Sequence, residues 1–401
     1  MLKRRFFKYF AITPELKVFC VLIFAISIGA STYVPIISRY VETFTPNPIA
    51  IGLLATLAWT VYMLLAEPAG YLCDKLGSKR MVLIGGLLAG FGALLIFSIN
   101  NIFVYIIACF LWGSGDALFW SATKMLTVEL SSKTNRTFSF GMYDSSWGFG
   151  WAFGPLIGGA AAYIWGLSVP FLFFGIIVLA TLPFFIKYVP ETKCTNTKIY
   201  TAVKELLFDG KAAKDGIAFL RVSSSKVRFA LSIKFALYAT FALVEVFLPL
   251  LRDNFNNLEI GIVFFVWAAV CALTEIFAGA LGDKYGRRTF IAFGFIGAGI
   301  SLALIAVSSS FVPVLCFTVM LALTTAFIEP LVDAFFYDSI KKSVRGLASG
   351  LSISAAGLGY VIAPIVGGIL AYFGGYIMPL YLASGILIFS SIASVIFMYS
   401  K

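Results

Sequence analysis

Histidine is absent from this 401-residue chain, and charged residues make up only 12% of it. The lack of imidazole excludes a histidine-based metal site or general base, so any proton transfer within the chain would fall to carboxylates. No G-x4-G-K-[ST] phosphate loop is present either, which argues against ATP-driven pumping by this chain alone. We therefore expect neither an enzyme nor a bound cofactor or metal.

Cysteine is also scarce, and its spacing is uninformative. The six cysteines show no paired pattern of the kind that marks a disulfide framework or a zinc site. They are Cys20, Cys73, Cys109, Cys194, Cys271 and Cys316.

Long apolar runs are what the sequence has in abundance. Hydrophobic residues make up 60% of the chain, in runs of about 20 residues, the length that crosses a bilayer as a helix. Nearly all Lys and Arg residues fall on one side of the implied membrane, and Arg39 and Arg252 fall on the other. The positive-inside bias makes the basic side cytoplasmic. The net charge of +11 thus reflects topology and anionic lipid, and does not indicate a nucleic-acid partner.

Charge clusters and Pro, Gly and Asn turns divide the apolar runs into twelve predicted spans, which leaves both termini cytoplasmic. The fold class is therefore an all-α integral membrane protein. The predicted spans are 18–41, 50–72, 81–99, 102–127, 138–163, 168–188, 228–251, 258–281, 289–309, 311–337, 347–372 and 377–399. We expect an N-terminal six-helix bundle over 1–188, a cytoplasmic linker with a surface helix over 189–227, and a C-terminal six-helix bundle over 228–401.

A short basic turn occurs twice, once in each half. Gly70 to Arg80 reads GYLCDKLGSKR, and Gly279 to Arg288 reads GALGDKYGRR, with an offset of 279 − 70 = 209 residues. A glycine pattern repeats at the same offset. It comprises Gly141, Gly150, Gly154, Pro155, Gly158 and Gly159, which return as Gly350, Gly359, Ala363, Pro364, Gly367 and Gly368. Each half is therefore a copy of the other in the same orientation.

The basic turn resembles the signature cytoplasmic loop of the major facilitator superfamily, which implies two pseudo-symmetric six-helix bundles. In that family the loop is a conformational latch between the halves. One departure from the family pattern is Ser78, which stands where the family usually has Arg. The alternative to a latch is that the basic residues only keep this turn on the cytoplasmic side. The latch residues implied are Gly70, Asp74, Gly77, Lys79, Arg80, Glu129, Arg136, Gly279, Asp283, Gly286, Arg287, Asp338 and Arg345.

The glycine pattern of the fifth span resembles the motif of the twelve-span drug/proton antiporter branch. Glycines remove side chains from one helix face, so a neighbouring helix can pack closely, and Pro155 bends the helix. Ordinary small-residue packing is the alternative. One departure concerns the fourth span, where Cys109 stands in place of an Arg that drug exporters commonly carry.

Charged side chains inside the membrane are the candidates for coupling and substrate contact, because each is costly to place there. A buried carboxylate favours its neutral form, which suits proton uptake and release. We prefer Asp144 and Glu329 as the coupling pair, and salt-bridge or substrate-facing roles remain open for each acid. The candidates for proton coupling and the substrate cavity are Asp144, Glu329, Asp116, Glu245, Lys124 and Lys234.

Aromatic residues on the same spans are candidates for an apolar cavity wall that accepts flat or cationic compounds. These are Tyr33, Trp112, Trp120, Trp147, Trp151, Tyr238, Phe241 and Phe327, of which we expect only a minority to face a cavity because the chain holds 41 Phe.

The expected function is proton-coupled efflux of small amphipathic compounds across the cell membrane by alternating access, by a monomer whose partners are its substrate, protons and lipid. The alternative is a proton-coupled symporter that imports a nutrient or metabolite. A sensor with a transporter fold is a further possibility. Neither substrate nor direction follows from the residues.

Overall fold

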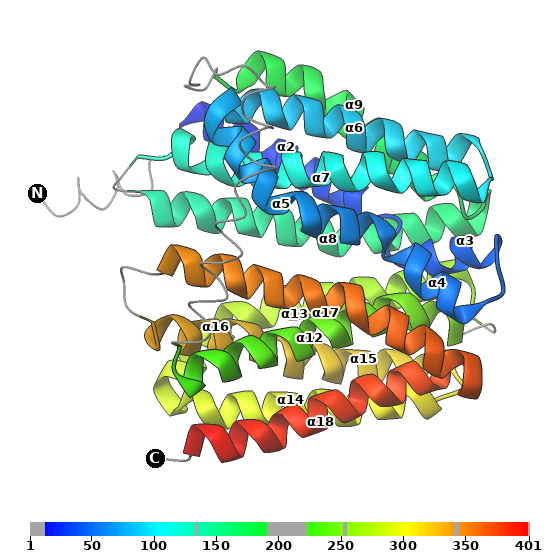
Figure 1. Ribbon diagram of the computed structural model, residues 1–401, viewed down its shortest axis with the longest axis vertical. Coiled ribbons are helices and arrows are strands. Elements are labelled where there is room, and N and C mark those ends of the chain that lie inside the picture. The colour runs from blue at the N-terminus through cyan, green and yellow to red at the C-terminus, as the bar shows by residue number, and fades with distance from the viewer. Residues whose placement is uncertain (1–12, 133–134, 191–222, 252–254, 341–344, 400–401) are drawn as a thin grey trace, which may run out of the picture. The chain divides into compact units, whose positions relative to one another are not determined.

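The computed structural model describes residues 13–132, 135–190, 223–251, 255–340 and 345–399. These residues form helices joined by short turns, without a strand among them. The expected linker helix within 189–227 falls mostly on residues outside that description. Figure 1 labels the helices, and their bounds are α2 Pro14–Ser31, α3 Ile37–Glu42, α4 Pro48–Ala55, α5 Leu57–Leu76, α6 Ser78–Ser98, α7 Ile102–Leu130, α8 Arg136–Trp165, α9 Val169–Tyr188, α12 Ser225–Leu251, α13 Asn257–Tyr285, α14 Arg287–Val307, α15 Phe311–Thr325, α16 Ile328–Asp338, α17 Arg345–Gly374 and α18 Ile377–Tyr399.

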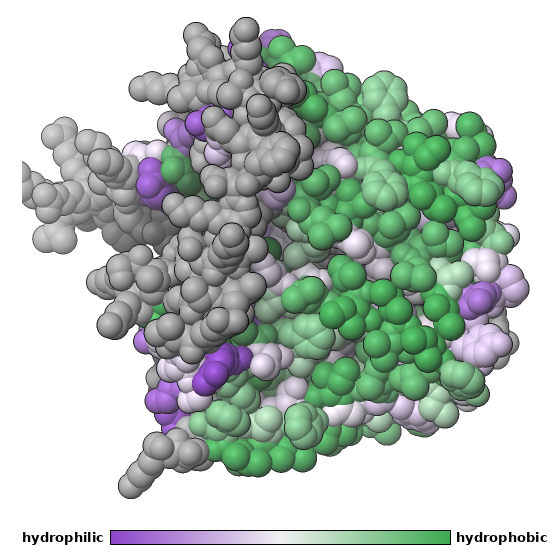
Figure 2. Space-filling model, in the orientation of Figure 1, coloured by the Kyte–Doolittle hydropathy of each residue, from purple (hydrophilic) through white to green (hydrophobic). Residues whose placement is uncertain are grey.

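Eleven helical segments in the described part of the chain are long and apolar enough to cross a membrane. They coincide with eleven of the twelve predicted spans. The remaining span is α8, which is 30 residues long and carries Asp144 together with the glycine pattern. Most of the coloured surface in Figure 2 is apolar. Large apolar side chains such as Phe103 and Phe373 are exposed. The chain is a multi-pass membrane protein.

The chain forms two compact units. The first comprises residues 1–33 and 57–209, and the second comprises 34–56 and 210–401. Within the second, α12, α17 and α18 pack on one another, as their neighbouring ribbons show in Figure 1. The segment 34–56, which contains α3 and α4, therefore packs with the second half of the sequence although it belongs to the first two spans.

Three of the predicted spans are interrupted, where the sequence predicts continuous helices. The first span is divided between α2 and α3 next to Pro35, and the second between α4 and α5 at Thr56. The tenth is divided at Ala326 and Phe327, so Glu329 lies in the first turn of α16. Such breaks are tolerated within a membrane where neighbouring protein groups or water in a cavity form hydrogen bonds with the backbone N–H and C=O groups that the break leaves unpaired.

The two basic turns have the same backbone geometry. Gly77 precedes α6 with φ of 94°, and Gly286 precedes α14 with φ of 102°. Glycine adopts this left-handed region without a steric penalty, whereas other residues do so rarely. The positions differ by 286 − 77 = 209 residues, so the repeat read from the sequence is also a repeat of backbone conformation.

The glycine pattern of α8 packs against α2. A Cβ built on Gly150 would lie 2.5 Å from the Phe24 carbonyl oxygen, and one on Gly158 would collide with the Thr32 carbonyl oxygen. By contrast, a Cβ on Gly141 would meet nothing within 4 Å. The close approach explains why only hydrogen fits on this face of the helix.

We predict that Gly158→Ala destabilises the protein by about 1–3 kcal/mol, because the added methyl group overlaps a main-chain oxygen that cannot move away as a side chain could. The measurement is the apparent melting temperature in detergent. Gly141→Ala is the matched control on the same helix, and its melting temperature should be unchanged or higher because alanine favours helix more than glycine does. Equal losses for both variants would contradict the packing described.

Candidate functional site

A tyrosine and a carboxylate meet within the second unit at the break in the tenth span. The Tyr238 hydroxyl on α12 donates a hydrogen bond to the Glu329 carboxylate on α16. Glu329 occupies the first turn of α16, where the helix dipole favours negative charge. The broken span thus places an acid, a donor and a helix N-terminus at one point.

Two further acids of the second unit are held close to this pair. Lys234, one turn before Tyr238, forms an ion pair with Asp333 at 2.7 Å. Tyr360 of α17 donates to Glu245 at 3.1 Å, and its ring lies 5.8 Å from that of Tyr238. Tyrosine side chains therefore connect the acids on α12 and α16 through α17.

An acid on the fourth span, in the first unit, has an indole partner. Trp112 donates its ring N–H to Asp116 at 2.8 Å, one turn away on α7. In the described residues Asp116 forms no ion pair. Trp112 is itself fully buried, with its ring centroid 4.4 Å from that of Tyr33. Two of the predicted aromatic wall residues are thus packed inside the first unit, beside a predicted acid.

Asp144 is exposed on α8, and the charge of Lys124 acts on it. One turn further along α8, Trp147 and Trp151 stack with their centroids 5.6 Å apart. Trp59 of α5 adds an edge contact to Trp151 at 6.3 Å. This face of α8 combines a carboxylate with accessible aromatic rings, an arrangement able to attract a cation.

The remaining predicted aromatic residues pack within their own units. Trp120 contacts Phe119 at 5.2 Å between centroids, and Phe327 stacks on Phe290 at 5.2 Å. Phe241 lies between Tyr238 and Trp267, at 5.7 Å and 5.3 Å. The acid network of the second unit is therefore continuous with an aromatic cluster.

The two basic turns contact acidic residues at matching positions. Arg287 forms an ion pair with Asp338 at 2.7 Å. At the positions 209 residues earlier, the Ser78 hydroxyl donates to Glu129 at 3.1 Å. The repeat therefore preserves a contact between each basic turn and the end of the fourth or tenth span, through a hydroxyl–carboxylate hydrogen bond in the first copy and an ion pair in the second.

Other predicted latch residues have varied settings. The Lys79 ammonium donates to the Ile186 carbonyl oxygen at 2.9 Å near the end of α9, where a cation complements the helix dipole. Arg80 and Arg136 are exposed, and Gly70 has open space around its Cα. The side-chain positions of Asp74, Gly279, Asp283 and Arg345 lie outside the described residues.

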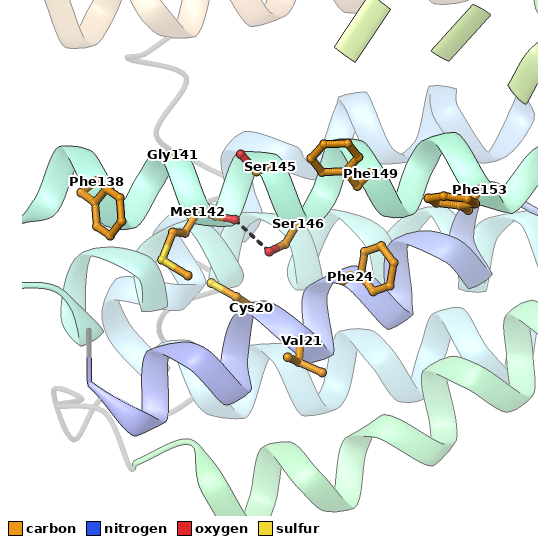
Figure 3. A pocket seen from close by; sticks show the side chains of 10 residues that line it. All are labelled: Cys20, Val21, Phe24, Phe138, Gly141, Met142, Ser145, Ser146, Phe149 and Phe153. Carbon is orange, nitrogen blue, oxygen red and sulfur yellow. Dashed lines mark hydrogen bonds between the residues drawn. The ribbon is translucent and has the colours of Figure 1, made fainter. Parts of the chain in front are cut away.

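A surface groove of about 910 Å³ lies between α2 and α8. Figure 3 shows Phe24, Phe149 and Phe153 along one end of it, and Ser146 hydrogen-bonded to the Met142 carbonyl oxygen. Its lining has hydroxyl and thiol groups but no charge. The groove suits an apolar group, and the described carboxylates lie elsewhere.

The sequence matches the model of the Major Facilitator Superfamily over residues 19–228 and 230–401. The chain belongs to the Major Facilitator Superfamily. It is similar to an uncharacterised MFS-type transporter of Methanocaldococcus jannaschii, 24% identical over 89% of this chain and 92% of that one. It is also similar to the quinolone resistance protein NorA of Staphylococcus aureus, 23% identical over 91% of both chains. The solved structure of the nucleoside transporter NupG shares its fold, with a TM-score of 0.76 and 14% identity over 96% of this chain and 99% of that one.

This membership confirms the predicted family and fold, and the exclusion of an enzyme. The protein is a membrane transporter that acts on small molecules. Sequence reasoning missed Tyr360, whose hydroxyl holds Glu245, and Trp59, which extends the tryptophan stack. Their signal was weak because each is one aromatic residue among many in apolar spans.

We predict that Arg287→Ser destabilises this transporter by about 0.2–1 kcal/mol, because it removes the ion pair with Asp338. The apparent melting temperature in detergent should fall by up to about 2 °C. The loss should be absent when Arg287→Ser is introduced into a chain that already carries Asp338→Asn. An equal loss in that background would mean that the arginine acts elsewhere.

Proposed function

We propose that this transporter exports small amphipathic compounds from the cell in exchange for protons, with Glu329 as the principal proton carrier. It acts in the cell membrane as a monomer with both termini in the cytoplasm. The observation that carries the proposal is the Tyr238–Glu329 hydrogen bond at the break of the tenth span. Support for export comes from the similarity to a protein named for quinolone resistance.

Glu329 suits proton exchange because some neighbouring groups stabilise its ionised form and others favour its neutral form. The ionised carboxylate is stabilised by the Tyr238 hydroxyl, the positive charge of Lys234 and the N-terminus of α16. The neutral acid is favoured by burial and by the negative charge of Asp333. Since Lys234 is already paired with Asp333, it is not committed to Glu329.

Asp144 is the first unit's contribution in this mechanism. It is exposed beside the stacked Trp147 and Trp151, so a flat or cationic compound would find both charge and ring faces on α8. Asp116 and Glu245 are each held by one aromatic donor. They supply further polar contacts or proton sites in the two units.

Protonation of Glu329 favours one state of the transport cycle, and its deprotonation on substrate binding favours the other. The basic turns stabilise one of the two states as latches, which the Arg287–Asp338 and Ser78–Glu129 contacts would anchor within each half. Because proton and substrate bind preferentially to different states, the proton gradient drives export.

We predict that Glu329→Gln reduces pH-gradient-driven transport of ethidium in proteoliposomes at least tenfold, because glutamine keeps the shape of the side chain but carries no exchangeable charge. Gradient-independent counterflow of ethidium should persist, and the added change Asp144→Asn should not restore coupling. Glu15→Gln removes an exposed acid at the start of α2 and should leave both activities within about twofold of the parent. Full gradient-driven transport in the double variant would exclude Asp144 and Glu329 as the coupling pair.

Export also predicts a phenotype in cells. A strain that lacks the protein should accumulate more ethidium or become more sensitive to quinolones, and expression of the intact chain should reverse the change. The measurement is ethidium efflux and inhibitory concentration with and without a protonophore. Unchanged sensitivity together with proton-dependent uptake of a nutrient would instead identify an importer.

A further inference from the structure

Arg39 joins the end of the first span to the second half of the chain. On α3, its guanidinium donates to the carbonyl oxygens of Pro249 and Phe255, each at 3.0 Å, and to the Asn257 side-chain oxygen at 2.8 Å. All of these residues belong to the second unit. One side chain thereby bridges α3 to the end of α12 and the start of α13.

Arginine is well suited to this bridge. Its planar guanidinium presents several fixed donors at once, whereas lysine offers a single charged point. Arg39 is also one of the few basic residues on the side of the membrane opposite the basic turns, where the topological bias disfavours them. A local contact accounts for its presence on that side.

Two further contacts hold the same segment. Tyr376, after α17, donates to Glu42 of α3 at 3.1 Å. The helices α4 and α17 approach so closely that a Cβ on Gly52 would collide with the Pro364 carbonyl oxygen, and one on Gly368 would lie 2.6 Å from that of Pro48. Gly368 belongs to the repeated glycine pattern. In the second copy, that pattern therefore also packs against a helix from the first part of the chain.

We propose that Arg39, with its partners Pro249, Phe255 and Asn257, is the lock of an external clamp, and that the Gly52–Pro364 and Gly368–Pro48 contacts are its seat. The clamp fixes α3 and α4 to α12, α13 and α17. Because the same segment is continuous with α2 and α5 of the first unit, opening the transporter on this side requires these bonds to break. That this face of the transporter is external rests on the orientation proposed above, whereas the contacts of the clamp do not depend on it.

The clamp is tested with a reporter cysteine beside the lock. Ser38 neighbours Arg39 and is 0% exposed, and Ser38→Cys changes one atom. A membrane-impermeant maleimide is applied to intact cells and to inside-out vesicles, and labelling of the parent chain without Ser38→Cys is subtracted. This measurement needs no substrate and no proton gradient, so it is independent of the proposed export activity.

We expect Arg39→Ala to increase the labelling rate of Ser38→Cys about tenfold, since three hydrogen bonds from a charged group are lost. Arg39→Lys should give a smaller increase, because the lysine ammonium keeps the positive charge but lacks the fixed set of N–H donors of the guanidinium. The control is Thr43→Ala at the C-cap of α3. Among the described residues its hydroxyl donates to the Tyr40 carbonyl oxygen, and the substitution should leave the rate unchanged.

Gly52→Ala provides a second route that leaves Arg39 in place, and it should raise the rate as well. Folding is checked by size-exclusion chromatography in detergent. Equal labelling rates of Ser38→Cys in the folded Arg39→Ala and Thr43→Ala variants and in the Ser38→Cys parent would contradict the role of Arg39 as the lock. An unchanged labelling rate in the folded Gly52→Ala variant would contradict the role of the glycine contacts as the seat. Increased labelling only in inside-out vesicles would retain the clamp and reverse the orientation.

Discussion

A carboxylate within a bilayer needs donors, because hydrocarbon cannot replace the water that it loses. This transporter supplies them from aromatic side chains. Trp112 donates a hydrogen bond to Asp116, Tyr238 donates one to Glu329, and Tyr360 donates one to Glu245. An aromatic donor stabilises an ionised acid without the permanent positive charge of Lys or Arg. The acid can then lose or gain a proton without leaving a buried cation unpaired, a penalty that a full ion pair would impose.

The duplicated halves keep the same scaffold and carry different chemistry. The turn glycines Gly77 and Gly286 share a left-handed backbone, and both glycine patterns lie at close helix contacts. The acids are not repeated in this way. Position 329 corresponds by the 209-residue offset to Trp120, so the second unit has a hydrogen-bonded carboxylate where the first has an aromatic ring. Scaffold positions are constrained by packing in both halves, whereas the candidate acids lie at positions that this packing does not repeat.

The spans, the repeat and the family could be predicted because they depend on local and periodic features: apolar length, glycine spacing and the sign of charge. The breaks at Pro35, Thr56 and Ala326 could not be predicted, because each depends on which neighbouring helices form hydrogen bonds with the backbone groups that the break leaves unpaired. The partners of the acids were equally hidden. Tyr360 is 115 residues from Glu245 in sequence, and nothing in its own neighbourhood distinguishes it from the other tyrosines. Arg39 was recognised as an exception to the charge bias, but its partners lie more than 200 residues away.

The interrupted spans connect the acid chemistry to movement. A continuous helix transmits displacement along its length, while a break lets its two parts move separately. In the tenth span the break lies beside Glu329, so in the proposed mechanism a change in the charge of this acid would act at the joint between α15 and α16. In the first span the break separates α2, which packs on the glycine face of α8, from α3, which is bonded through Arg39 to α12 and α13. One span therefore contributes to both units.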